Sequence, residues 1–120
     1  MTPPATAAAP PQLAWTRGEF KVRVQDWQGR RVTDRFTGYV AGPFGIHHYE
    51  FLVSSGWTVT HLNSGHAIGP DFPTLKAAKQ FCTEIAPLAE WNQLTAKNAK
   101  RETGLRDAVK AAAVRHGGYR

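Results

Sequence analysis

Residues 20–40, with the sequence FKVRVQDWQGRRVTDRFTGYV, alternate apolar and polar side chains with a period of two on both sides of a glycine. Such alternation is typical of a half-buried β-strand. Phe20, Val22 and Val24 lie on one side of the first strand, and the segment 26–31 around Gly29 is expected to turn the chain into a second strand. The sequence therefore predicts an antiparallel hairpin at the start of the fold.

A three-residue loop in this hairpin would set the register of its two strands. Val24 would then lie opposite Asp34, Val22 opposite Phe36, and Arg23 opposite Arg35. The core face of the hairpin would consist of Val22, Val24, Val32 and Phe36. The other face would gather four cations and two aromatic rings: Lys21, Arg23, Arg31, Arg35, Trp27 and Tyr39.

Turn residues divide the next part of the chain into three further short strands. We expect the third strand at about 46–53, the fourth at 57–62 after a turn at 54–56, and a short fifth strand at 66–69. One face of the third and fourth strands is expected to carry Tyr49, Phe51, Val53, Trp57, Val59 and His61.

Two helices are expected after the sheet. Thr74 is a suitable N-cap for a first helix at about 75–88, and Pro87 favours its end. The apolar residues of this helix recur at helical spacing, so that one stripe can lie on the sheet: Leu75, Ala78, Phe81, Cys82, Ile85 and Leu88.

A last helix is expected within residues 94–115, with Gly104 as a weak point or break and Gly117 and Gly118 as a stop. The fold class that follows is α+β: an antiparallel meander of four or five short strands and two C-terminal helices, the first packed on the sheet. We divide the chain into a disordered Pro- and Ala-rich tail, a sheet-plus-helix domain, and a basic C-terminal helix and tail, at residues 1–12, 13–93 and 94–120.

Composition limits the classes of protein to which the chain can belong. With 120 residues, 42% of them hydrophobic, it has the length of one domain and enough apolar bulk for a core. Cys82 is the only cysteine, which excludes an internal disulfide and a zinc cluster built from cysteines. Residues 1–12 lack the pattern of a signal peptide, and no stretch reaches the roughly 20 apolar residues of a membrane span. We therefore expect a cytoplasmic protein with no membrane partner.

The net charge of +6 is unevenly placed along the chain. Residues 97–120 carry +5, residues 17–40 carry +3, and residues 41–96 carry −2. Clustered like charge costs self-repulsion that a counter-charge relieves. Nucleic acid is the commonest anionic partner of such a chain, ahead of an anionic membrane surface and an acidic protein. We expect nucleic acid, DNA first, with an acidic protein surface as the alternative.

Two basic segments are the candidate nucleic-acid-binding sites. The first is the hairpin face, because Arg forks suit phosphates and guanine edges and aromatic rings can stack on bases. The second is the C-terminal helix, whose cations can contact successive phosphates: Lys97, Lys100, Arg101, Arg106, Lys110 and Arg115. The alternative interpretation of the hairpin is an ordinary solvated sheet face, and that of the helix is solubility with favourable placement of cations near a helix C-terminus.

Three histidines suggest a different chemistry. Strand pairing could bring His47, His61 and His66 together, and imidazoles suit zinc or act as general bases. The alternative is that a histidine beside Trp57 and Val59 is a core or rim residue bonded to the backbone. No HExxH or paired-carboxylate pattern accompanies the histidines, so we expect neither a cofactor nor a catalytic residue.

Residues 56–81 run from a Gly-Trp strand through a Ser-Gly turn and a second strand to Phe72, Thr74, Ala78 and Phe81. This stretch resembles the sheet-then-helix ending of AP2-like and integrase arm-type DNA-binding modules. The resemblance implies a small antiparallel sheet that docks in a groove of DNA and a helix that braces the sheet. It departs from those modules because residues 57–69 contain no Arg or Lys, so base contacts would have to come from the first hairpin.

The leading prediction is a small non-enzymatic module that binds DNA through both basic segments, which must then face one ligand. The first alternative is a phage or mobile-element accessory protein that binds or inhibits a host protein through an exposed apolar patch near Trp15, Phe44 or Trp91. The second alternative is a metal-dependent hydrolase that uses the histidines.

Overall fold

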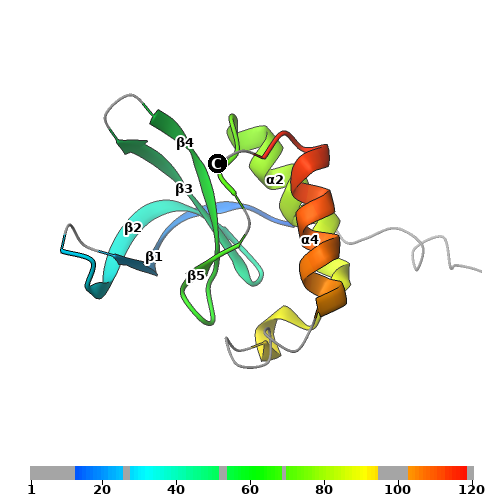
Figure 1. The fold of residues 1–120 in the computed structure, drawn as a ribbon, viewed down its shortest axis with the longest axis horizontal. Coiled ribbons are helices and arrows are strands. Elements are labelled where there is room, and N and C mark those ends of the chain that lie inside the picture. Colours follow the sequence, from blue (N-terminus) through cyan, green and yellow to red (C-terminus); the bar gives the residue numbers. More distant parts are fainter. Residues whose placement is uncertain (1–12, 26–27, 52–53, 69, 95–102, 119–120) are drawn as a thin grey trace, which may run out of the picture.

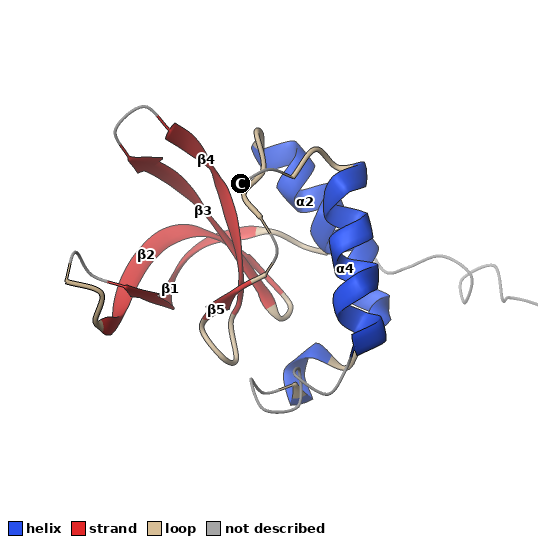
Figure 2. Cartoon of the chain, viewed as in Figure 1, coloured by secondary structure: helices blue, strands red, loops and turns tan. Residues whose placement is uncertain are grey.

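The computed structural model describes residues 13–25, 28–51, 54–68, 70–94 and 103–118, and Figure 1 shows their arrangement. Five antiparallel strands pair in sequence order: β1 (Thr16–Gln25), β2 (Arg31–Ala41), β3 (Phe44–Phe51), β4 (Ser54–His61) and β5 (His66–Ala67). The helical elements that follow are α2 (Leu75–Ile85), η1 (Ala86–Leu88), η2 (Trp91–Gln93) and α4 (Thr103–Arg115). The helices gather on one side of the sheet (Figure 2), and the predicted α+β class is confirmed.

The β1–β2 hairpin has the predicted division of side chains between its two faces but not the predicted register, and Val32, which was predicted for the core, is exposed. Val24 pairs with Val32 instead of Asp34, because residues 26–30 connect the strands in place of a three-residue loop. The other pairs predicted from the shorter loop are wrong by the same shift: Val22 with Phe36 and Arg23 with Arg35. Side chains alternate with a period of two, so a shift of two residues leaves each side chain on its expected face.

Gly38 allows β2 to approach β3 closely. It lies directly opposite Gly18, and a Cβ placed on it would collide with the backbone carbonyl of Ile46 in β3. Only glycine permits this close approach of the β2 and β3 backbones. With the two glycines opposite each other, Phe20 pairs directly with Phe36.

The sheet curls until its first strand meets the turn between β4 and β5. The backbone N–H of Arg23 donates to the carbonyl oxygen of Gly65 at 2.7 Å. The curl gives the sheet an inner face and an outer face. The inner face carries Phe20, Val22, Phe36, His47 and Thr60. The outer face carries Tyr39, Ile46 and Val59, and α2 covers it over β3 and β4.

The residues of β3 and β4 that lie together on one face of the sheet are not the predicted ones. Val59 pairs with Ile46, and His61 pairs with Phe44, so the expected grouping of Trp57, Val59 and His61 with odd-numbered residues of the third strand is wrong. Strand β3 already begins at Phe44, and the chain turns back between residues 51 and 54 instead of at 54–56. An odd shift of register exchanges the two faces of a strand.

Helix α2 begins where the sequence predicts. The Thr74 hydroxyl oxygen accepts a hydrogen bond from the N–H of Ala77 at 3.0 Å, which confirms the N-cap. The helix ends at Ile85 and continues as a 3-10 turn around Pro87, so it is shorter than predicted. Its buried side chains pack on the outer face of the sheet: Ala78, Phe81, Cys82 and Ile85.

Helix α4 runs unbroken from Thr103, with Gly104 in its first turn. The predicted glycine stop is confirmed, because Gly117 has a φ of 77° and the N–H of Gly118 donates to the carbonyl oxygen of Ala113 at 2.8 Å. The helix packs on α2 and adds three buried residues to the same core: Val109, Ala112 and Ala113. The predicted tail at residues 1–12 lies outside the described residues.

Two of the residues suggested for an exposed apolar patch lie in the core instead. Phe44 is 0% exposed and Trp91 is 6% exposed, and their rings meet edge to face at 5.3 Å. The indole N–H of Trp91 donates to the carbonyl oxygen of Ile85 at 2.9 Å. Trp15 is half-buried. Within the described residues, no helix has both the length and the apolar character needed to cross a membrane.

Candidate nucleic-acid interface

The outer face of the β1–β2 hairpin gathers cations. Pairing places five of them on this face, which we call the ribbon face: Arg17, Lys21, Arg23, Arg31 and Arg35. All five side chains are exposed. The grouping of four predicted cations with Tyr39 on one face is therefore confirmed, and Trp27 lies outside the described residues.

The ribbon face keeps an excess of positive charge because Glu19 pairs only weakly with Arg35. Lys21 lies directly opposite Arg35, and like charges in that position destabilise a strand pair. Glu19 Oε1 lies 3.5 Å from Arg35 Nη1, but the two side chains are 57% and 63% exposed. An exposed pair of this kind contributes little to stability. Among the described residues of β1 and β2, this face thus carries one carboxylate and five cations.

His66 extends the ribbon face onto β5. Burial lowers the pKa of His66, and the positive charges of Arg23 and Arg31 lower it further. Both effects favour the neutral form of the imidazole. The hydrogen bond from the Arg23 N–H to the Gly65 carbonyl oxygen places β5 beside β1 and its cations.

The ribbon face continues toward α2 through Tyr39. The guanidinium carbon of Arg17 lies 5.3 Å from the centre of the Tyr39 ring, and Nζ of Lys79 lies 5.2 Å from it. The sequence reasoning missed both cations. Arg17 has the same strand parity as Lys21, which was a usable signal, whereas Lys79 reaches this ring only because α2 packs on the sheet.

A groove of about 550 Å³ lies where the chain before β1 passes α2. Lys79 lines this groove and also approaches the Tyr39 ring, so the groove lies at the α2 end of the ribbon face. Its lining combines apolar and cationic side chains: Leu13, Trp15, Leu75, Lys76, Lys79, Gln80 and Thr83.

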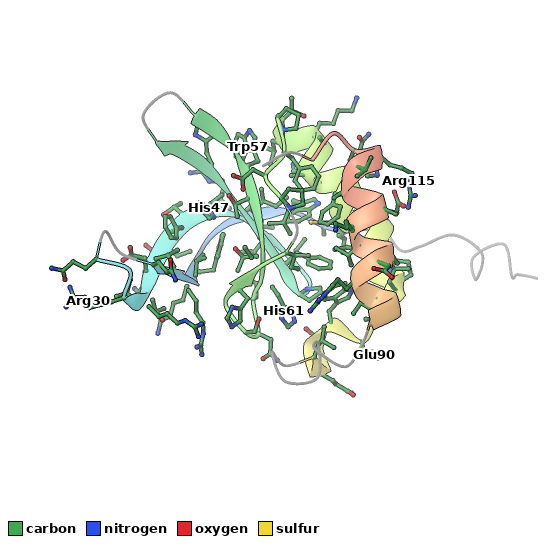
Figure 3. All side chains as sticks on the ribbon, in the orientation of Figure 1. Arg30, His47, Trp57, His61, Glu90 and Arg115 are labelled. Atoms are coloured by element: carbon green, nitrogen blue, oxygen red, sulfur yellow. The ribbon has the colours of Figure 1, made fainter. Side chains whose placement is uncertain are left out.

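The cations of the C-terminal helix lie elsewhere. Arg106 and Lys110 are exposed on α4, and Arg115 pairs with Glu84 of α2, whose other oxygen lies 2.7 Å from His116 Nε2. Three further predicted residues lie outside the described part: Lys97, Lys100 and Arg101. Figure 3 shows Arg30 at the hairpin tip and Arg115 at the opposite end of the fold. The hairpin tip and α4 therefore do not form one surface.

The structure separates His47 from the other two candidate metal-binding histidines. His47 lies on the inner face, and His61 and His66 pair with each other on the outer face. His61 Nε2 lies 2.6 Å from the Trp91 carbonyl oxygen, to which it must donate, and its Nδ1 is hydrogen-bonded with the Ser64 hydroxyl at 2.8 Å. Both nitrogens of His61 are thereby used for structure, and the described residues contain no group of three or more side chains suited to a metal ion.

His47 is a core residue with an unusual environment. Its ring stacks on Phe36 with centroids 4.2 Å apart, and its Nδ1 makes no hydrogen bond within the described part of the chain. Burial lowers the pKa of His47, Asp71 opposes this effect, and His48 adds to it. The expectation that the histidine beside Trp57 and Val59 is a core or rim residue bonded to the backbone is confirmed for His61, which is 5% exposed, and His47 is also buried, at 6% exposed.

Comparisons of the chain with protein families, with curated proteins and with solved structures find no match.

Proposed function

We propose that this protein is a non-enzymatic nucleic-acid-binding module that contacts duplex DNA through the ribbon face. The observation that carries the proposal is the placement of five exposed cations against one carboxylate on one face of a two-stranded ribbon. An array of cations with so few internal partners attracts a polyanion and releases its counterions on binding.

The dimensions of the ribbon suit the major groove of B-form DNA. A two-stranded antiparallel ribbon has the width that this groove admits, whereas the major groove of A-form RNA is too narrow for side chains to read. Arg17 and Arg23 are six positions apart on β1, which corresponds to about 20 Å of strand and about six base pairs of duplex rise. Thr33 and Thr37 on the same face add hydroxyls that can bond to phosphate.

The resemblance to AP2-like and integrase arm-type modules is part of this proposal. In it, β1 and β2 supply the docking sheet and α2 braces the sheet from β3 and β4. The α2 helix lies on the same outer face as the cations, next to the ribbon, and contributes Lys79 at their border. We also propose a cytoplasmic location, where such a module meets DNA.

A salt titration with a matched pair of variants tests the proposal. Binding of a fluorescently labelled duplex is followed by anisotropy between about 50 and 200 mM salt. The ribbon variant is Lys21→Gln/Arg23→Gln, and the control is Arg106→Gln/Lys110→Gln, which removes the same charge from exposed positions on α4. The ribbon variant should bind about tenfold or more weakly and lower the slope of log K against log salt by roughly two.

Equal weakening by the two variants would show that net charge, and not the ribbon face, governs binding. Absence of any salt-dependent binding to DNA would overturn the proposal altogether. Thermal melting of both variants checks that each is folded during the titration.

A further inference from the structure

The groove beside α2 is continuous with the proposed DNA-binding surface. Trp15 lies just before β1 and two positions before Arg17, and Lys79 of the groove lining lies 5.2 Å from the centre of the Tyr39 ring on the ribbon face. Trp15 and Leu13 form one wall of the groove, and residues of α2 form the other. Nucleic acid that follows the ribbon face from its tip toward the helices therefore reaches this groove.

The cations around the groove have no carboxylate partner in the described residues. Arg17 and Lys79 both approach the ring of Tyr39, at 5.3 and 5.2 Å. Two cations held at one ring repel each other, and an anion near both would relieve that repulsion. Lys76 adds a further positive charge to the same lining, and the first turn of α2 contains no acidic residue.

We propose that this groove holds an unpaired nucleotide of the nucleic acid bound on the ribbon face. Its base stacks on the Trp15 indole, and its phosphate lies near Lys76 and Lys79. The groove volume of about 550 Å³ falls within the range of small-ligand sites, about 300 to 1,000 Å³. This inference rests on the proposed function and adds to it a preference for DNA in which a duplex adjoins a single strand.

The combination of side chains favours a nucleotide over a purely apolar or purely anionic ligand. An exposed part of an aromatic ring offers a stacking surface that accepts any base, and adjacent lysines neutralise the backbone. Gln80 in the lining can exchange hydrogen bonds with a base edge. The groove should therefore bind an unpaired base with modest sequence preference.

Two DNA probes separate this inference from the proposed function. One is a blunt duplex, and the other is the same duplex with a short unpaired oligothymidine extension, tested at either end. The wild-type protein should bind the extended duplex roughly five- to hundredfold more tightly, the range expected for one stacked base. Trp15→Leu should remove this gain while the affinity for the blunt duplex stays within about twofold of wild type.

Lys79→Gln and Lys110→Gln form a charge-matched pair for the same measurement, since Lys110 lies exposed on α4. Only Lys79→Gln should reduce the gain from the extension. Trp15→Phe keeps an aromatic ring and should retain most of the gain in affinity. In the wild-type protein, a base stacked on Trp15 should quench tryptophan fluorescence when the extended duplex binds. This quenching should be lost in Trp15→Phe.

Each outcome decides one proposal. Equal affinity of wild type for the two probes would overturn the nucleotide site and leave duplex binding intact. Failure of both probes to bind would overturn duplex binding and, with it, the nucleotide site. A gain in affinity from the extension that persists in both Trp15→Leu and Lys79→Gln would place the unpaired nucleotide elsewhere and overturn this assignment. Tighter binding of an acidic peptide than of the extended duplex would also overturn it and would assign the groove to a protein partner.

Discussion

Replacing Gly38 by alanine tests the close approach of β2 and β3 on which the whole arrangement of the ribbon depends. The added Cβ would meet backbone atoms of Ile46 and His47, which cannot rotate away as a side chain can. Insertion of a methyl group into a well-packed site costs about 1 to 3 kcal/mol, and a collision with backbone belongs at the upper end. We expect Gly38→Ala to lower the free energy of unfolding by about 3 kcal/mol and the melting temperature by roughly 10 °C.

Two other glycines provide matched controls for this substitution. Gly18 lies directly opposite Gly38, but a Cβ there would meet only the side chain of Val40 at 3.2 Å, so Gly18→Ala should cost less than about 1 kcal/mol. Gly104 has nothing within 4 Å of its added Cβ and lies in a helix, so Gly104→Ala should stabilise the protein by about 0.5 to 1 kcal/mol. Urea unfolding followed by circular dichroism measures all three. A cost for Gly38→Ala no larger than that for Gly18→Ala would refute the reasoning.

Three further predictions concern a helix cap, a buried histidine and the contact between two helices. Thr74→Ala should lower the free energy of unfolding by about 1 kcal/mol, because the first turn of α2 loses its N-cap. The pKa of His47 is lowered in the fold, so its contribution to stability is present above the unfolded pKa of about 6.5 and is lost as pH falls below that value. His47→Phe should therefore make stability less dependent on pH between 7 and 5. Glu84→Gln should cost up to about 1 kcal/mol, because Arg115 loses a partially exposed ion pair.

Controls for these variants come from neighbouring positions. Thr83→Ala removes a hydroxyl that donates to the Lys79 carbonyl inside α2, and it should not destabilise the helix start. His48→Phe removes only a lesser cause of the lowered pKa of His47, so it should reduce the pH dependence of unfolding less than His47→Phe does. Glu90→Gln changes an exposed carboxylate outside α2 and should have an effect below about 0.5 kcal/mol. If the free energy of unfolding of His47→Phe depends on pH as steeply as that of wild type, another group causes the loss of stability at low pH.

Local pattern was enough to identify most of the elements. The alternation around Phe20 predicts β1, the threonine before Leu75 predicts the start of α2, and the glycine pair after Arg115 predicts the end of α4. The structure bears out each of these, because period, capping and turn chemistry act over a few residues. Strand register was not predictable in the same way, since it depends on the length of the connection after β1 and on where the chain turns after β3.

In the candidate site, too, some features follow from local sequence pattern and others only from tertiary packing. The amino-acid sequence by itself determined that the chain is basic, that it folds as a meander followed by helices, and that Lys21, Arg23, Arg31 and Arg35 share one face, because strand parity survives a shift of two residues. The tertiary structure decided which other groups join that face. Packing of α2 brings Lys79 to Tyr39 and forms the groove at Trp15, and it leaves α4 at the far end from the hairpin tip. These relations join segments distant along the chain, so they follow from core packing and not from any local pattern.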